Sequence, residues 1–248
     1  MAVLGVAGCA SGPLDATGQA LFDAGYKSFQ DGRYREADEK FSAVIKRSPT
    51  TWALSEVYYF RGLSRLKLNR RPEAKQDFRA GATVYGRELT QVYSAVALAN
   101  LEYEEGNDPA AVRIYRQALD HKVKGLPADY ILYRLGVSLQ RLGKWGEADD
   151  CFAELVSKYP QSSLAADARR RFQTTYFTVQ VGAFADRANA QKTADRLRAE
   201  GYPVTLSVSV AAGKTLHTVC AGRYATYREA ALAADVLKAK GYPALVKP

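Results

Sequence analysis

The sequence predicts an all-α array of repeated helix pairs, followed by a smaller α+β domain with a four-stranded antiparallel sheet. A 37-residue period runs through residues 18–162, and a different period of 40 residues runs through residues 176–248. Between them, after Phe172, helical spacing gives way to strict alternation of apolar and polar residues. With 248 residues, 47% of them hydrophobic, the chain is long enough to form two cores without disulfide bonds.

Four segments of the first repeat align without gaps, and each is predicted to form a helix, a short turn and a second helix. Small residues recur in one column of each helix, which lets the two backbones approach closely. An aromatic residue one turn later fills the gap, and Gly or Asn in the turn favours the left-handed conformation that ends a helix. In repeat order, the columns are Gly25, Gly62, Ala99 and Gly136; Ala37, Ala74, Ala111 and Ala148; Phe41, Phe78, Tyr115 and Phe152; and Gly32, Asn69, Gly106 and Gly143.

These columns resemble those of the tetratricopeptide repeat, slightly stretched in length. The resemblance implies a superhelix whose concave wall is formed by the first helix of each pair. We expect this wall to bind an extended peptide or a helix of a protein partner, although an aromatic stripe at this spacing also fits packing between helices. The candidate groove residues are Tyr26, Tyr59, Asn100, Tyr103 and Tyr133.

A short helix over residues 164–172 is expected to cap the array. Its final arginines, Arg169, Arg170 and Arg171, suit the helix dipole, and we interpret them as a solvated helix end. A short link over residues 173–175 then leads to the second domain. The expected divisions are residues 1–17 for an N-terminal linker, residues 18–173 for the four repeats with their cap, and residues 174–248 for the α+β domain.

The second repeat is predicted to consist of two β-α-β halves. The first half has an alternating strand from residue 177, a helix over residues 187–200 and a second strand over residues 204–210. The second half repeats this order 40 residues later, with Gly222 matching Gly182. Two such halves form a four-stranded antiparallel sheet with both helices on one side, which leaves the other face open to solvent.

The segments FTVQVGAF at residues 177–184 and HTVCAGRY at residues 217–224 of this duplicated unit resemble the SPOR domain. That family binds bacterial septal peptidoglycan, specifically glycan strands that lack stem peptides. Small hydroxyl and amide side chains on the open face suit a ligand rich in hydroxyl and N-acetyl groups, because each can donate and accept hydrogen bonds. The residues expected to bind glycan are Tyr176, Thr178, Gln180, Ala183, Phe184, Leu216, Thr218, Arg223 and Tyr224.

Two of these positions depart from the family pattern. Some members carry an aromatic residue and an arginine where this chain has Leu216 and Thr218. This difference removes an aromatic surface on which a sugar could stack and a set of hydrogen-bond donors. The resemblance therefore leaves undecided how tightly this domain binds glycan. Arg223 and Tyr224, just beyond, are placed to replace them in part.

The N-terminal segment VAGC at residues 6–9 resembles the lipobox of bacterial lipoproteins. The resemblance implies a lipid anchor on Cys9 and, with Ala10 next to it, export to the outer membrane. Acyl chains contribute about 0.8 kcal/mol per buried CH₂ and anchor a protein without a transmembrane helix. The basic residues of a signal are missing, which we interpret as a start codon assigned too late; the alternative is an incidental cysteine. The expected location is the periplasm, at the outer membrane, with enrichment at the division septum.

Composition and motifs argue against catalysis. The two histidines, His121 and His217, lie far apart in the sequence, and the three cysteines show no CxxC spacing. No phosphate loop, HExxH motif or nucleophile elbow is present. We therefore expect no catalytic residue, no metal and no cofactor.

The net charge of +9 favours an anionic or polyhydroxylated partner, and residues 174–248 carry ten basic against five acidic side chains. Because basic and acidic residues are mixed in an exported domain, nucleic acid is not an expected partner. The leading hypothesis is a non-enzymatic adaptor of the cell envelope, which binds peptidoglycan through the α+β domain and a protein through the repeats, in cell division or wall remodelling. The alternative is an outer-membrane assembly scaffold whose sheet has little affinity for glycan.

Overall fold

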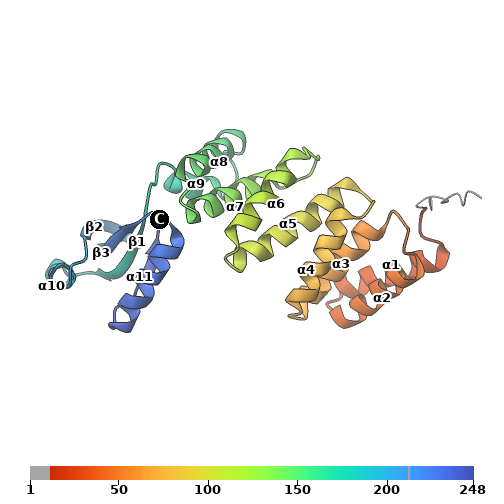
Figure 1. The fold of residues 1–248 in the computed structure, drawn as a ribbon, viewed down its shortest axis with the longest axis horizontal. Helices are drawn as coiled ribbons and strands as arrows, with labels where there is room; N and C mark the ends of the chain where they lie inside the picture. Colours follow the sequence, from red (N-terminus) through yellow and green to blue (C-terminus); the bar gives the residue numbers. More distant parts are fainter. Residues whose placement is uncertain (1–11, 212) are drawn as a thin grey trace, which may run out of the picture. The chain divides into compact units, whose positions relative to one another are not determined.

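The computed structural model describes residues 12–211 and 213–248, so Cys9 and its lipobox lie outside the described residues. Successive helix pairs are followed by a small sheet with two helices (Figure 1). The chain forms two compact units, one ending at Ile131 and the other beginning at Leu132, and each is described by itself. Within the described residues, no helix has both the length and the apolar character to cross a membrane.

The helical region confirms the predicted series of helix pairs, with one left-handed residue in each turn. The φ angles are 76° at Gly32, 60° at Asn69, 77° at Gly106 and 75° at Gly143. The helices are α1 (Ala16–Gln30), α2 (Tyr34–Arg47), α3 (Leu54–Lys67), α4 (Arg71–Thr83), α5 (Glu88–Glu104), α6 (Asp108–Asp120), α7 (Ala128–Arg141), α8 (Trp145–Lys158) and α9 (Ala165–Arg171).

Close approach within each pair explains the glycine and aromatic columns. A Cβ atom on Gly62 would lie 2.7 Å from Cε1 of Phe78, and one on Gly25 would lie 3.0 Å from Cε1 of Phe41. Both phenylalanine side chains are fully buried. The aromatic ring of the second helix therefore occupies the space in which a side chain of the first helix would stand.

Buried ion pairs join the first two helix pairs of the first unit. Asp77 accepts hydrogen bonds from Nη2 of Arg61 at 2.6 Å and Nη1 of Arg65 at 2.8 Å. Asp38 accepts from Nε of Arg65 at 2.9 Å and from Arg70. Arg65 on α3 therefore connects acids on α2 and α4, and the two buried carboxylates keep charged partners.

The second unit contains the predicted capping helix, α9, and corrects one interpretation of its arginines. Arg169 and Arg170 are exposed, as expected of a solvated helix end. Arg171 instead packs inward: it donates to Asp167 at 3.0 Å and to Oε1 of Gln140 at 3.2 Å. The interpretation is therefore wrong for Arg171, because its side chain holds α9 against α7.

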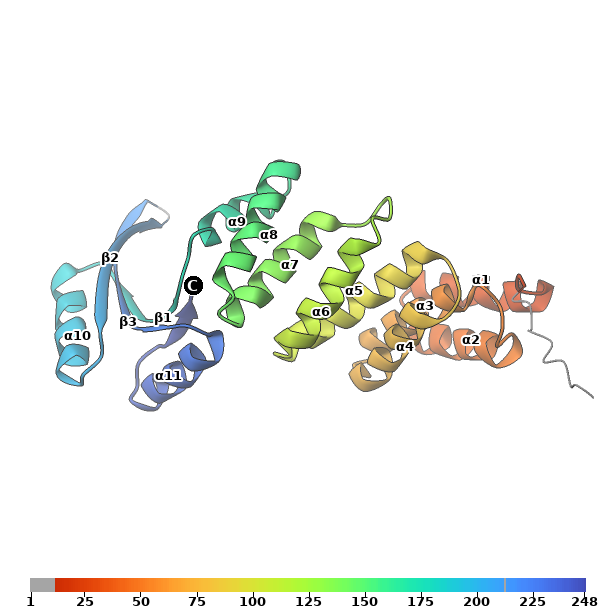
Figure 2. The ribbon, with the colours of Figure 1, turned by 45° about the horizontal axis from the view of Figure 1, so that its top comes forward.

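The C-terminal sheet has four antiparallel strands in the order β2-β3-β1-β4, as predicted. Valines 179, 181 and 219 share one core with Leu197 of α10 and Leu237 of α11, so both helices cover the same face. Figure 2 shows these helices beside the sheet. The elements are β1 (Phe177–Phe184), α10 (Arg187–Ala199), β2 (Val204–Ala211), β3 (Lys214–Tyr224), α11 (Tyr227–Ala239) and β4 (Leu245–Lys247).

The last helix pair contacts the sheet directly within the second unit. The ring of Trp145 on α8 lies 5.0 Å from that of Phe177 on β1, which in turn lies 5.8 Å edge-on from that of Tyr227 on α11. The backbone N–H of Gln173 donates to Asp149 on α8 at 3.0 Å. Residues 173–175 are thus held between the two parts and are not a free tether.

Candidate functional site

On the face of the sheet opposite α10 and α11, polar side chains from three neighbouring strands lie side by side in rows that run across the strands. Gln180 of β1 pairs with Cys220 of β3, which pairs with Thr205 of β2. The next row contains Ala183, Thr218 and Ser207. No helix of the C-terminal domain covers this face, so we define it as the open face, and the predicted residues Thr178, Gln180, Thr218 and Leu216 lie on it by strand register.

Two irregularities of the strand pairing decide which predicted residues reach the open face. Between Gln180 and Gly182 the partner moves by only one residue, so β1 contains a bulge. The bulge reverses the alternation, which brings Ala183 to the open face and turns Phe184 toward the core under the helices. Tyr224 packs against the same core. The structure therefore separates Phe184 and Tyr224 from the other predicted glycan-binding residues.

Each of these aromatic rings covers a glycine two residues earlier. A Cβ atom on Gly182 would lie 2.5 Å from Cε2 of Phe184, and one on Gly222 would collide with the ring of Tyr224. Gly222 also has a φ angle of 75°, at the second irregularity of the pairing. The repeated Gly-x-aromatic motif thus shapes the ends of β1 and β3, and its rings fill the core.

Charge and aromatic character gather at one end of the open face. The guanidinium of Arg223 lies 4.7 Å from the ring centre of Tyr176, a cation–π contact. Lys247 of β4 pairs with Thr178, whose hydroxyl donates to the carbonyl of Gly222 at 3.0 Å. Burial raises the pKa of the Cys220 thiol, which favours its neutral form.

Sequence analysis missed two residues of this face, Leu245 and Lys247, which extend it along β4. Leu245 pairs with Gln180 and is 54% exposed. The duplication could have predicted them, because β4 occupies in the second half the place that β2 occupies in the first. β4 is too short, however, for an alternation of apolar and polar residues to show which of its side chains face the core.

A groove of about 490 Å³ in the first unit contains two of the predicted partner-binding residues, Tyr59 and Asn100. Tyr93 also lines it, with its ring 6.0 Å from that of Tyr59, and burial raises the pKa of Tyr59. Tyr93 could have been found from helical spacing, since it precedes Val96 by three residues. The lining residues are Tyr59, Leu63, Leu66, Lys67, Arg71, Tyr93, Val96, Ala97, Asn100, Leu101 and Glu104.

Within the groove, the amide oxygen of Asn100 accepts hydrogen bonds from the hydroxyls of Tyr115 at 2.5 Å and Tyr130 at 3.0 Å, so this side chain is fixed in position. The predicted groove residues other than Tyr59 and Asn100 lie outside this lining. Tyr26 is 37% exposed, with its ring 4.9 Å from that of Phe60. Tyr103 is half-buried and lies outside the lining of the groove.

Tyr133, in the second unit, contacts the capping helix. Its hydroxyl donates to Asp167 and accepts from Nε of Arg171 at 3.2 Å. Burial raises the pKa of Asp167, but hydrogen bonds from Tyr133, Arg171 and Arg170 outweigh it and lower that pKa to about 2. The polar end of Tyr133 is therefore engaged within the fold.

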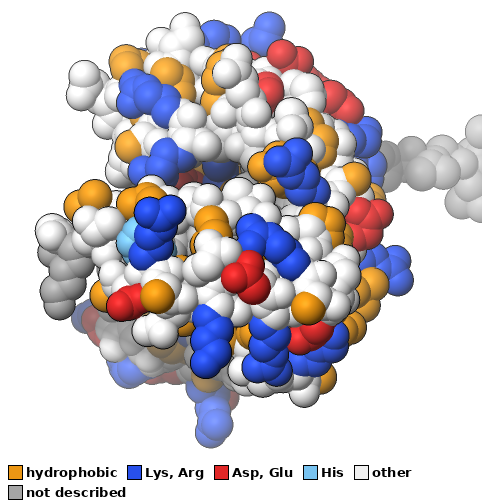
Figure 3. All heavy atoms as spheres, turned by 90° about the vertical axis from the view of Figure 1, so that its left-hand side faces the viewer, with side chains coloured by type: hydrophobic (Ala, Val, Ile, Leu, Met, Phe, Trp, Pro, Cys, Tyr) orange, Lys and Arg blue, Asp and Glu red, His pale blue; other side chains and the backbone are white. Residues whose placement is uncertain are grey.

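The part of the chain that the structure describes holds no group of three or more His, Cys, Asp or Glu side chains arranged to bind a metal. Basic side chains are more frequent than acidic ones and are dispersed over the surface in Figure 3, which views the molecule from the side on which α10 lies in Figure 1.

Comparison with known families matches one stretch of each part. Residues 173–248 match the family model of the SPOR domain. The chain ends in a SPOR domain. Residues 130–162 match the model of the tetratricopeptide repeat, which spans α7 and α8. SPOR domains bind peptidoglycan and occur in the cell envelope, and tetratricopeptide repeats mediate protein interactions, so the chain combines two kinds of binding domain.

Solved structures similar to this chain contain tetratricopeptide repeats. One such protein from Parabacteroides merdae superposes with a TM-score of 0.56 at 16% identity, over 75% of this chain and 68% of its own. PilF of Pseudomonas aeruginosa superposes with a TM-score of 0.51 at 18% identity, over 62% and 66%. At these identities the likeness shows the fold alone. No curated protein matches the chain in sequence.

Proposed function

We propose that the protein is a non-enzymatic adaptor of the cell envelope, which binds glycan strands lacking stem peptides through its SPOR domain and recruits a protein partner through its repeats. The observation that carries the proposal is the open face of the sheet. It places an amide, two threonine hydroxyls and a serine hydroxyl, from Gln180, Thr178, Thr218 and Ser207, on one surface outside the helices. Gln180, Thr218 and Ser207 can bind sugar hydroxyl and N-acetyl groups as donors and acceptors at successive positions along a strand, and the Thr178 hydroxyl, which donates to Gly222, can accept.

The chemistry of this face favours a glycan without peptides. Tyr176 and Leu245 offer apolar contact at its borders, and Arg223 and Lys247 supply the positive charge. A polar face that extends over neighbouring strands suits an extended chain, and bulky stem peptides would interrupt contact along it. Accumulation of such strands at the septum would place the protein in cell division or wall remodelling.

Binding to purified sacculi tests the proposal. The full chain should sediment with amidase-treated sacculi and much less with untreated ones. Gln180→Ala and Arg223→Gln should each weaken binding several-fold, since each removes hydrogen bonds worth about 1 kcal/mol or more. Arg228→Gln, an exposed α11 residue, is the matched control and should bind like the unchanged protein. Equal binding to both kinds of sacculi would contradict the proposed ligand.

The partner of the repeats is proposed to bind the groove around Tyr59, Tyr93 and Asn100. An apolar wall formed by Leu63 and Val96 supports a peptide or helix with hydrophobic side chains. Site-specific photocrosslinking from residue Leu63 in living cells should capture one dominant partner. Crosslinks of equal yield from exposed Lys192 on α10 would show that the groove has no special role.

Attachment to the outer membrane is proposed to occur through Cys9, on the strength of the VAGC segment. Two or three acyl chains are sufficient for stable anchoring. With an upstream signal supplied, Cys9→Ser should move the protein from the membrane fraction to the soluble periplasm. An unchanged membrane fraction would exclude this anchor.

One observation favours a second candidate, an assembly scaffold whose SPOR domain binds glycan weakly. Leu216 and Thr218 stand where some SPOR domains carry an aromatic residue and an arginine. The scaffold predicts that the protein localises normally after residues 174–248 are deleted. The adaptor predicts that the deletion disperses it around the envelope.

A further inference from the structure

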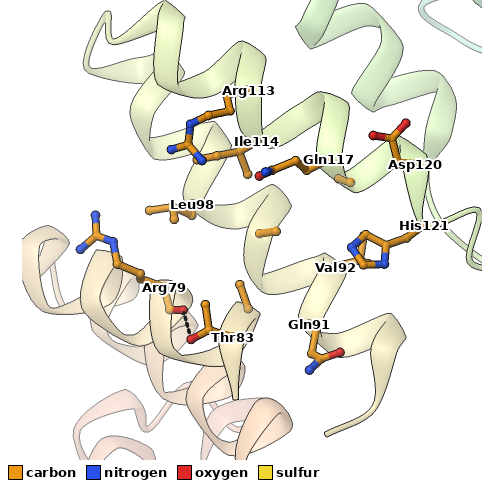
Figure 4. Close-up of a pocket in the computed structure, with 13 residues that line it drawn as sticks. Arg79, Thr83, Gln91, Val92, Leu98, Arg113, Ile114, Gln117, Asp120 and His121 are labelled. Carbon is orange, nitrogen blue, oxygen red and sulfur yellow. Dashed lines mark hydrogen bonds between the residues drawn. The ribbon is translucent and has the colours of Figure 1, made fainter. Parts of the chain in front are cut away.

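A second pocket in the first unit lies between the second helices of two successive repeats. It has a volume of about 530 Å³, within the range of ~300–1,000 Å³ typical of ligand pockets. α4 and α6 form its sides and α5 forms its floor (Figure 4). The lining residues are Arg79, Ala82, Thr83, Gln91, Val92, Ala95, Leu98, Arg113, Ile114, Gln117, Ala118, Asp120 and His121.

This pocket lies on the opposite side of α5 from the groove described above. Gln91, Ala95 and Leu98 face the pocket, whereas Tyr93 and Asn100 face the groove. At about 100° per residue these two sets point in opposite directions from the helix axis. The pocket is therefore a separate site, which a partner in the groove would leave free.

Small side chains create the hollow and aliphatic ones line its floor. Ala82, Ala95 and Ala118 stand where longer side chains would fill the space between the helices. Val92, Leu98 and Ile114 are 1%, 7% and 6% exposed, so they close the floor with apolar side chains of which a small area reaches solvent. An aliphatic side chain of a ligand would lose its contact with water here, which contributes about 25 cal/mol per Å² of apolar area.

Two arginines stand at one end of this floor, and the charge of Arg79 helps to lower the pKa of the Glu102 carboxyl without forming an ion pair with it. Arg79 of α4 and Arg113 of α6 lie on opposite sides of Leu98, away from His121 (Figure 4). Both side chains are exposed, and neither makes an ion pair or hydrogen bond within residues 12–211 and 213–248. The nearby carboxylate of Glu102 is already bonded to Lys75 at 2.9 Å and Asn107 at 2.7 Å.

The other end of the pocket is closed to anions. Asp120 carries a negative charge there, and Nδ1 of His121 lies 3.0 Å from Oε1 of Glu88. The pocket is thus basic at one end, apolar in the middle and acidic at the other. Carboxylates of a ligand are therefore expected at the end where Arg79 and Arg113 lie on either side of Leu98.

We propose that this pocket binds an acidic peptide segment of a partner protein, in which carboxylate side chains flank an aliphatic residue. The aliphatic side chain packs on Val92, Leu98 and Ile114, and the carboxylates accept hydrogen bonds from Arg79 and Arg113. Guanidinium–carboxylate pairs combine charge with fixed geometry. The site is distinct from the proposed partner groove and from the SPOR open face.

Fluorescence anisotropy with three labelled peptides tests the proposal on the full chain. The probe contains Glu-Leu-Leu-Glu between Gly-Ser flanks, and the two comparison peptides replace it with Gln-Leu-Leu-Gln or Glu-Ser-Ser-Glu. The first should bind at least about tenfold more tightly than either comparison peptide, since both charge and apolar contact are required. Binding should weaken as salt is raised.

Variants locate the binding. Arg79→Gln and Arg113→Gln should each raise the Kd about tenfold, because each removes one charged hydrogen-bonding partner. Ala95→Phe fills the pocket without changing its charge and should also weaken binding, with thermal unfolding recorded to show that the variant folds. Arg169→Gln, an exposed arginine outside the pocket, is the matched control and should leave the Kd unchanged.

Two results would overturn the proposal. One is equal affinity for the Glu-Leu-Leu-Glu and Gln-Leu-Leu-Gln peptides. The other is loss of binding in Leu63→Glu, a variant of the groove, together with unchanged binding in Arg79→Gln and Arg113→Gln. That second pattern would assign the acidic peptide to the groove and leave the proposed adaptor function intact.

Discussion

Replacement of Gly136 by alanine tests the packing rule on which the helical repeats depend. A Cβ atom there would lie 2.6 Å from Cε1 and 2.8 Å from Cζ of Phe152, well inside contact distance. Phe152 is fully buried and has no room to withdraw. Overpacking of this kind costs about 1–3 kcal/mol, which opposes the gain of about 1 kcal/mol that alanine brings to a helix interior. We expect a net loss of up to about 2 kcal/mol.

Chemical denaturation of the variant and of two companions separates these contributions. Gly146→Ala is the matched control, because a Cβ atom on this helical glycine meets nothing within 4 Å. It should raise the free energy of unfolding by up to about 1 kcal/mol. Gly136→Ala combined with Phe152→Leu should lose less stability than the sum of the two single changes. A Gly136→Ala variant as stable as Gly146→Ala would show that Phe152 accommodates a Cβ atom at residue 136 without cost.

Two further predictions concern the second unit. The Asp167 carboxyl has a pKa of about 2, below its ordinary 3.8, so its contacts stabilise the fold above about pH 4 and are lost as the pH falls toward 2. After allowance for solvent screening, these contacts contribute about 1–2 kcal/mol to the free energy of unfolding. Asp167→Asn should therefore reduce the loss of stability between about pH 4 and pH 2, measured by urea unfolding. An unchanged loss of stability over this pH range would exclude this role. Trp145→Ala removes the ring that contacts Phe177 and should destabilise the unit by about 2 kcal/mol. Hydrogen exchange should then quicken at residues 173–177, and unchanged exchange there would show that the contact does not hold the SPOR domain to the last repeat.

The repeat architecture could be predicted because its steric requirements are local. Gly62 must be small because Phe78 lies over it, and both positions recur at the 37-residue period. Each turn needs a residue that tolerates positive φ, and Gly32 and Asn69 both meet that need. A short window of sequence contains both partners of each constraint.

The candidate sites were harder to predict, since they depend on features that the hydrophobic pattern does not show. The bulge beside Gly182 reverses the alternation of β1, so Phe184 faces the core although simple alternation allowed it in the glycan site. Arg171 was interpreted as a solvated residue because nothing in its own helix indicates Gln140 of α7 as a partner. The pocket beside Ala95 forms where three helices leave space between them, and no spacing of residues in the sequence indicates such a space.

The most direct test of the account is an NMR titration of the full chain with soluble glycan strands released by amidase. Binding through the open face predicts that amide shifts concentrate at Thr178, Gln180, Thr218 and Lys247, and that α10 and α11 change little. Glycan strands that retain their stem peptides should produce much smaller shifts at the same concentration. Shifts confined to α10 or α11, or equal shifts from both kinds of strand, would contradict the central claim.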